Sequence, residues 1–153
     1  MKCLIFNTKE ISFTKGESSG RPPGITPIPS DADYQTYYNI VVAFVCAEAN
    51  DNNDDISTIA NELLRYHNMV GKKILVVPFV HLSCNVAVLG GYQYIKQLSK
   101  ILEEKCILEG ILGFGYHRSL IAKWISLNHK GSVAFRDSKY KKYQNLNEEK
   151  ENG

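Results

Sequence analysis

The stretch KKILVVPFVHLSCNVA, residues 72–87, combines a run of strand-forming residues with a group of reactive side chains. Its aliphatic residues predict a buried strand over 73–79, and Pro78 marks the end of sheet pairing because proline has no N–H to donate. The residues that follow carry imidazole, hydroxyl, thiol and amide groups, in His81, Ser83, Cys84 and Asn85. Ligands of α/β proteins bind just past strand ends, so this stretch is a candidate functional site, with a helix cap as the alternative.

Outward from this stretch, the apolar pattern predicts further strands and two helices. The run YYNIVVAFVCAE, residues 37–48, predicts a strand buried on both faces at its centre. Helical spacing predicts one helix from an N-cap at Asp54 or Asp55 to about Gly71, and another over Tyr92–Lys105. Shorter strands are predicted at 2–7 and at 11–13, where the second forms a hairpin with the first. Three more are predicted at 108–115, 119–127 and 132–136. The order favours α/β or α+β, with a mixed sheet and two main helices.

Two segments and one turn complete the predicted organisation. Residues 15–36 contain GRPPGITPIPSD, whose four prolines predict a long loop. Residues 128–131 predict a hairpin turn between the last two strands. Residues 138–153 are charged and poor in apolar side chains, which predicts a tail or linker stub after a single domain at 1–137.

The composition is that of an ordinary globular domain, with 153 residues, 44% apolar and 22% charged. The 18 basic and 16 acidic residues give a net charge of +2, which favours an anionic partner only weakly. No long apolar run predicts a membrane span, and the N-terminal MKCLIFNTKEISF lacks the features of a signal peptide. The four cysteines lie far apart with no CxxC pair, which predicts reduced, buried cysteines in a cytoplasmic protein.

His81 admits several interpretations. A histidine past a strand end suits proton transfer or polar recognition, although many such residues are structural. Ser83 or Asn85 is expected to cap the following helix. A Cys84–His81 nucleophile pair lacks an orienting third group in the sequence, and a metal site with His117 or His129 lacks a recognised ligand spacing, so no metal is predicted.

GFGYHRS, residues 113–119, forms a second candidate group. It does not extend to GxGxxG, so a dinucleotide site is not indicated. On a strand, Tyr116 and Arg118 share one face and His117 lies on the other. The guanidinium of Arg118 suits a phosphate, a carboxylate or an oxyanion, and a solvated arginine is the alternative. SKYKKY, residues 138–143, suits either RNA contact or a solvated tail.

Three segments taken together resemble one family, the archaeal editing domain of threonyl-tRNA synthetase. They are MKCLIFNTKEISF at the start, VVPFVHLSCNVA in the middle, and GFGYHRS with ISLNHKGSVAF near the end. The family opens with a short strand and hairpin and carries a Pro-Phe-Ala-His-Leu-Ser segment. It continues with Phe-Gly-Tyr-Tyr-Lys, a strand, a Lys-Gly turn and another strand. The resemblance covers most of residues 1–137 in the same order and at similar spacing.

The resemblance implies a D-aminoacyl-tRNA deacylase-like fold, usually a homodimer, without metal or cofactor. It implies hydrolysis of Ser wrongly attached to the 3′ end of tRNA-Thr, in cis or in trans to the catalytic part of a threonyl-tRNA synthetase. The physical need is plain, because Ser lacks one methyl group of Thr, and such a group is worth only about 1–3 kcal/mol in a pocket. A second site, small enough to refuse that methyl group, must remove the error.

The same resemblance implies the site residues. His81 shapes the amino-acid pocket, with the backbone of Val80 and His81 as one wall. Arg118 stabilises developing oxyanion charge or holds the terminal nucleotide, since a guanidinium stays protonated and is no base. The remaining implied substrate-binding residues are Pro78, Phe79, Val80, Ser83, Phe114, Gly115, Tyr116 and His117.

Some positions depart from the family pattern. Val80 stands where the family has Ala, His117 where it has a second Tyr, and Arg118 where it has a functional Lys. The acid that the family carries in its last strand has no counterpart here unless Asp137 serves, and the family's His-Ser-Asp is replaced by residues 7–9. Two alternatives therefore stay open: a D-aminoacyl-tRNA deacylase, and a diverged, catalytically weak RNA-binding or dimerisation module of the same fold.

Overall fold

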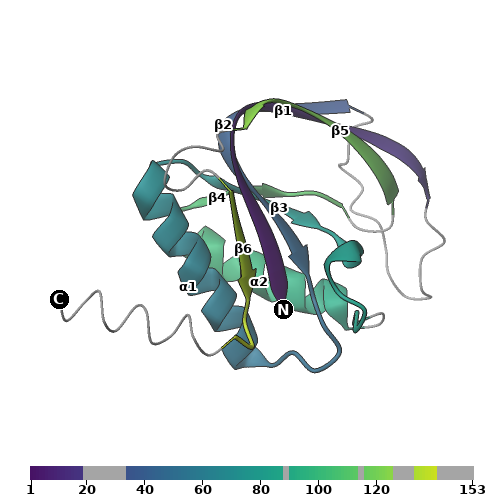
Figure 1. The fold of residues 1–153 in the computed structure, drawn as a ribbon, viewed down its shortest axis with the longest axis vertical. Helices are drawn as coiled ribbons and strands as arrows, with labels where there is room; N and C mark the ends of the chain where they lie inside the picture. The colour runs from purple at the N-terminus through teal and green to yellow at the C-terminus, as the bar shows by residue number, and fades with distance from the viewer. Residues whose placement is uncertain (19–33, 88–89, 114–115, 126–132, 141–153) are drawn as a thin grey trace.

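A mixed sheet forms the centre of the computed structural model, which describes residues 1–18, 34–87, 90–113, 116–125 and 133–140 (Figure 1). The described elements are β1 (Lys2–Ser18), β2 (Tyr34–Cys46), α1 (Asn53–Val70), β3 (Ile74–Pro78), the short 3-10 helix η1 (Val80–Leu82), α2 (Gly91–Glu104), β4 (Leu108–Ile111), β5 (Tyr116–Ile125) and β6 (Val133–Asp137). The strand order is β4-β3-β2-β1-β5, and β6 also pairs with β1.

The sheet is mixed because its two halves are connected differently. β2, β3 and β4 run parallel, and α1 and α2 provide the crossover connections that parallel strands require. β1 is antiparallel to β2, β5 and β6. The predicted class, a mixed sheet with two main helices, is confirmed.

The outer edge of β1 holds two strands end to end. Residues 8–18 of β1 pair with β5 and residues 2–6 pair with β6, both antiparallel. In the described part of the chain β5 and β6 therefore run in the same direction and pair with β1, so the hairpin predicted between them is wrong; its turn at 128–131 lies outside the described residues. The hairpin predicted between 2–7 and 11–13 is also wrong, because both segments belong to one continuous strand.

β1 and β2 bend midway (Figure 1). The C-terminal part of β1, the N-terminal part of β2 and β5 form a curled half of the sheet, which curves over the rest. Within β2, Asn39 has a φ of 52°, in the left-handed region, which asparagine tolerates better than most residues. Before the bend Cys3 and Ile5 of β1 face the helices, whereas Ile11 and Phe13, also at odd positions, join the cluster on the opposite face. The curled half of the sheet thereby closes a second core.

Two apolar cores result. In the first, both helices cover one face of the sheet through Ile56, Ile59, Leu63, Ile95, Leu98 and Leu102. The second lies between the other face and the curled half, and consists of Ile11, Phe13, Ile40, Val42, Phe44, Leu75, Val77 and Leu112. Residues 40–46 of β2 are buried throughout, as the sequence predicts for a central strand. Phe79 and Leu82 pack against the second core, which positions the segment after β3.

α1 begins at a capping box formed by Asn52 and Asp55. Asn52 Oδ1 accepts from the Asp55 N–H (3.1 Å), and Asp55 Oδ2 accepts from the Asn52 N–H (3.0 Å). The predicted N-cap at Asp54 or Asp55 is wrong, because Asp55 is the third helical residue and returns the hydrogen bond of Asn52. Gly71 ends the helix with a φ of 71°, which confirms the predicted end.

Three further details differ from or qualify the predictions. The loop predicted at 15–36 is shorter, because β1 extends to Ser18 and β2 starts at Tyr34, while 19–33 lie outside the described residues. All four cysteines are free, but Cys84 and Cys106 are exposed and only Cys3 and Cys46 are buried. Within the described residues, no helix combines the length and apolar character that a membrane crossing requires.

Candidate functional site

The segment after β3 leaves the sheet and turns through η1. The Phe79 N–H donates to the Val45 carbonyl (2.9 Å), which extends the parallel pairing with β2 beyond Pro78. η1 then turns the chain, and Ser83 is extended again, with φ −144° and ψ 148°. Residues 81–85, which were predicted to lie after a strand, therefore follow the end of β3.

The side chains of this segment divide into an inward and an outward set. The ring of Phe79 lies edge-on to Phe44, with centroids 5.5 Å apart, and packs with Leu82 against the second core. The ring of His81 lies edge-on to Phe79, at 5.2 Å, and is exposed. Val80 is also exposed. Apolar anchors thus hold a short turn whose Val80 and His81 side chains face outward.

The chain then returns beside the residues that follow β2. The Ala49 N–H donates to the Asn85 carbonyl (3.0 Å), and the Ala87 N–H donates to the Ala47 carbonyl (3.0 Å). Together with the bond from Phe79, these contacts close residues 80–84 into a loop that is tied at both ends to the same strand and its extension.

Ser83 has another role than the predicted one. Its hydroxyl donates to Glu48 Oε2 (2.7 Å) and accepts from the Asn85 N–H (3.0 Å). α2 starts at Gly91, with Gly90 as N-cap and no side-chain cap. The prediction that Ser83 or Asn85 caps this helix is therefore wrong, because the chain first pairs with residues 47–49 before the helix begins.

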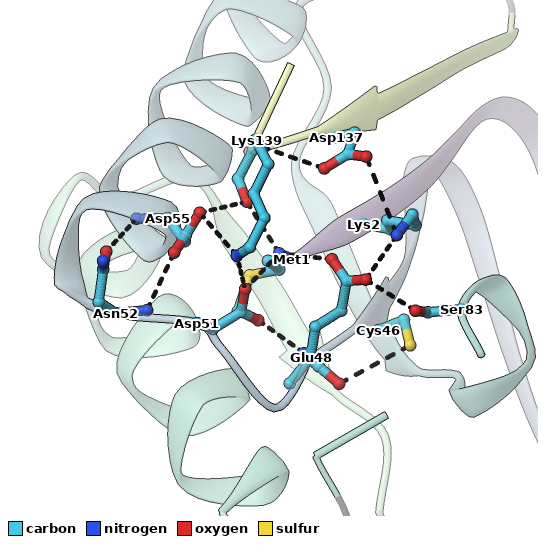
Figure 2. A network of polar contacts seen from close by, with 12 residues as sticks. Met1, Lys2, Cys46, Glu48, Asp51, Asn52, Asp55, Ser83, Asp137 and Lys139 are labelled. Carbon is cyan, nitrogen blue, oxygen red and sulfur yellow. Dashed lines mark hydrogen bonds and ion pairs between the residues drawn. The ribbon is translucent and has the colours of Figure 1, made fainter. Parts of the chain in front are cut away.

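Glu48 is the centre of a buried polar network (Figure 2). It is 4% exposed, and its Oε1 accepts from the Met1 ammonium (3.0 Å) while Oε2 accepts from Lys2 Nζ (2.5 Å) as well as from Ser83. Burial opposes ionisation, but the hydrogen bonds from Lys2, Ser83 and the Met1 ammonium outweigh it and lower the pKa of Glu48 to about 2. So acidic a carboxyl stays charged at neutral pH and is a poor base.

The network continues to the start of α1. The Met1 ammonium also contacts Asp51, and Lys139 Nζ lies 3.0 Å from Asp51 Oδ1 and 3.2 Å from Asp55 Oδ1. Ser138 Oγ donates to Asp55 Oδ1 (2.7 Å). Burial acts to lower the pKa of Lys139, but its hydrogen bonds to Asp51 and Asp55 raise it overall. Two residues assigned to the charged tail are therefore bound to the folded part, while the domain boundary at 137 stays a prediction.

Asp137 and Asn7, two residues at positions where the sequence departs from the family pattern, form polar contacts within the fold. Asp137 lies 3.8 Å from Lys2 Nζ and its Oδ1 accepts from the Lys139 N–H (3.0 Å), so it belongs to the same network. Asn7 Oδ1 accepts from Lys72 Nζ (2.7 Å). Both side chains are thus engaged in contacts that hold β1 and its neighbours together.

The second candidate group is described only in part. Phe114 and Gly115 lie outside the described residues, as do the side chains of Tyr116, His117 and Arg118. The backbone of these last three residues begins β5, where Arg118 is paired with Lys15 of β1. Ala122, further along β5, packs against the same core as Phe79 and Leu82. The roles assigned to residues 114–118 stay predictions.

Cys84 and His81 are both exposed, and the described ring contact of His81 is with Phe79 rather than with a third catalytic group. In the described part of the chain, no three His, Cys, Asp or Glu side chains are grouped so that they could hold a metal ion. The independence from metal stays a prediction.

Sequence reasoning missed Glu48 and its partner Lys2. The available signal was an acidic residue directly after the apolar run of β2, where a charge is buried and needs a cation. The cation itself could not be read locally, because Lys2 reaches this position through the pairing of β1 with Cys46 of β2.

Comparisons with known proteins bear on the family and on the fold. A model of the family described as Archaea-specific editing domain of threonyl-tRNA synthetase matches residues 1–127, which include residues 78–83 and 114–118 but not Asp137 or residues 138–143. A solved structure titled c-Myc DNA Unwinding Element Binding Protein is similar, with a TM-score of 0.57 and 12% identity over 90% of this chain and 98% of that chain. At this identity the likeness shows the fold alone, the predicted D-aminoacyl-tRNA deacylase-like fold. No curated protein matches the chain.

Proposed function

Because the chain belongs to the family of archaeal editing domains of threonyl-tRNA synthetase, we propose that it hydrolyses Ser wrongly attached to tRNA-Thr. Membership implies an aminoacyl-tRNA editing function, an ester hydrolysis, and association with tRNA and the synthetase. The identity of the amino acid, action in cis or in trans to the catalytic part, and a cytoplasmic location belong to the proposal.

The observation that carries the proposal is the way the segment 79–83 is held. Phe79 and Leu82 are anchored in the second core, and Ser83 is anchored to Glu48. Val80 and His81, between these anchors, are exposed. A short backbone turn fixed on both sides is suited to form a hard pocket wall, and refusal of one methyl group requires such a wall.

In the proposed reaction, a water molecule attacks the carbonyl carbon of the seryl ester with help from the 2′-hydroxyl of the terminal adenosine. The ester C–O bond breaks, the 3′ oxygen receives a proton, and free serine leaves. Arg118 stabilises the negative charge that develops on the carbonyl oxygen, or holds the nucleotide. Pro78, Phe79, Val80 and Ser83 support one side of the pocket, and Phe114, Gly115, Tyr116 and His117 form the other.

A single binding site distinguishes Ser from Thr weakly, since one methyl group is worth about 1–3 kcal/mol, or a factor of about 10–200. A synthetic site selects by requiring the methyl group, and the smaller Ser still enters it. An editing site of the proposed kind selects in the opposite sense, because it refuses the methyl group. The two selections multiply, which is the reason for a separate editing domain.

A homodimer is part of the proposal, and the curled half of the sheet offers a surface for it. Tyr34, Tyr38 and Ile121 are exposed there by 59%, 65% and 65%. Ser12 of β1 lies opposite Ile121 in β5 and opposite Thr36 in β2. Tyr34 and Tyr38 are two residues before and after Thr36, so their side chains lie on the same face of the sheet as Ile121. An exposed apolar face on strands of this length favours cover by a second copy.

Hydrolysis assays with three substrates test the proposal. The chain should hydrolyse Ser-tRNA-Thr well above the rate in buffer and leave Thr-tRNA-Thr largely intact. Faster hydrolysis of a D-aminoacyl-tRNA would favour the alternative that the fold also suggests. Binding of tRNA without hydrolysis of any ester would favour a catalytically weak RNA-binding module.

A further inference from the structure

Glu48 connects the candidate pocket segment to three other parts of the chain. It lies two residues past the end of β2 and binds Lys2 and the Met1 ammonium, from the start of the chain, and Ser83, from the loop after η1. Its own N–H donates to Asp51 Oδ2 (2.7 Å), just before α1. Figure 2 shows the two carboxylate oxygens of Glu48 directed toward Met1, Lys2 and Ser83.

The loop depends on this side chain for its fixation between the two backbone ties. Phe79 is tied to Val45, and Asn85 to Ala49, by backbone hydrogen bonds. Between these ties, and among the described residues, the bond from Ser83 to Glu48 is the short polar contact that joins the loop to the strand. The thiol of Cys46 lies at a longer 3.8 Å from the Val80 carbonyl.

The geometry argues against a catalytic serine. The Ser83 hydroxyl is engaged twice, as donor to Glu48 and as acceptor from the Asn85 N–H. Glu48 is itself held by two cations, the Lys2 ammonium and the Met1 ammonium, and a carboxylate held in this way does not take up the proton of a hydroxyl group. The pair is therefore built to hold a conformation.

We infer that Glu48 is a positioning residue for editing: through Ser83 it fixes the backbone of Val80 and His81 that limits the size of the admitted amino acid. The inference rests on the proposed function. Steric refusal of a methyl group requires a wall that does not yield, and a side chain locked by a buried ion pair provides the required support. Loss of Glu48 should therefore admit Thr more than it slows hydrolysis of Ser.

The test compares the ratio of single-turnover rate constants on Ser-tRNA-Thr and Thr-tRNA-Thr in five variants of the full chain. Glu48→Gln and Ser83→Ala should each lower this ratio about tenfold, the scale of one methyl group, and the double variant should lower it no further. Ser83→Thr keeps a hydroxyl group and should retain the parental ratio. Glu62→Gln is the matched control, because Glu62 is also buried and ion-paired, with Arg65 and Arg136, but lies on α1.

An unchanged ratio in Glu48→Gln and Ser83→Ala, with stability lowered as in Glu62→Gln, would overturn the inference and leave Glu48 a structural residue. Amide hydrogen exchange provides a readout that needs no substrate. The N–H groups of Phe79, Ala49 and Ala87, which tie the loop, should exchange faster in Glu48→Gln than in Glu62→Gln. If the parent hydrolyses neither ester, the proposed function fails, and the exchange rates still decide whether Glu48 holds the loop: equal rates in the two variants refute it.

Discussion

Replacing Glu48 with Gln should destabilise the fold by about 3 kcal/mol at neutral pH, and this difference should shrink in acid. Hydrogen bonds from Lys2, Ser83 and the Met1 ammonium outweigh the effect of burial and lower the pKa of this carboxyl from 4.5 to about 2. Each pKa unit corresponds to about 1.36 kcal/mol of preference for the charged form, which gives the magnitude. Gln keeps the size of the side chain and removes the charge, so it imitates the protonated state.

The sign follows from the direction of the shift. Because the pKa of Glu48 is lower in the folded than in the unfolded chain, its contribution is complete above the unfolded value of 4.5 and is lost as the pH falls through about 2. The gap between parent and variant should therefore fall to less than half by about pH 3.

Urea unfolding followed by circular dichroism, at several pH values between about 3 and 7, measures the gap directly. At neutral pH the melting temperature should fall by about 6–12 °C for a domain of this size. Glu104→Gln, at an exposed position of α2, is the control and should leave stability unchanged. A Glu48→Gln variant as stable as the parent at pH 7, or a gap that is equally large at pH 3, would refute the reasoning.

Four further predictions concern the assembly and the site. Light scattering at micromolar concentration should give the mass of a dimer, and a monomer would contradict the cover proposed for the curled sheet. His81→Ala should raise hydrolysis of Thr-tRNA-Thr more than it lowers that of Ser-tRNA-Thr; a collapse of the Ser rate by about 10²–10⁴-fold with unchanged selectivity would instead identify a general base. Arg118→Lys should keep substrate affinity roughly level and raise the single-turnover rate, because the compact ammonium of lysine and the planar guanidinium of arginine reach different atoms. Arg118→Met should lower both the affinity and the rate. A fully active Arg118→Met would show that Arg118 is a solvated strand residue. Chelation and Cys84→Ser should each leave hydrolysis unchanged, and loss of activity after either treatment would contradict the metal-free, thiol-free mechanism.

Local patterns predicted the features that depend on neighbouring residues. The central strand was predictable because residues 40–46 are apolar without interruption, as burial on both faces requires. The end of β3 was predictable because Pro78 cannot donate to the sheet, although the pairing continues for one more hydrogen bond, from the Phe79 N–H to the Val45 carbonyl. The end of α1 at Gly71 was predictable because glycine readily adopts the left-handed conformation.

The features that were not predictable depend on contacts distant in sequence. The continuity of β1 is decided by its partners β2 and β5, and β1 changes its buried face between Ile5 and Ile11 without a change in the spacing of apolar residues. The role of Ser83 is decided by Glu48, 35 residues earlier in the chain, and Glu48 in turn binds Lys2, 46 residues before it. A serine in a loop before a helix predicts an N-cap, and only the position of Glu48 in the fold shows the other role of Ser83.

The ratio of single-turnover rate constants on Ser-tRNA-Thr and Thr-tRNA-Thr, measured with the same tRNA and saturating enzyme, tests the central claim most directly. The proposed pocket predicts that Ser is removed at least about tenfold faster than Thr, since refusal of one methyl group is worth about 1–3 kcal/mol. Equal rates for the two esters, or no acceleration of either over buffer, would contradict the proposal that this chain is an editing site for Ser.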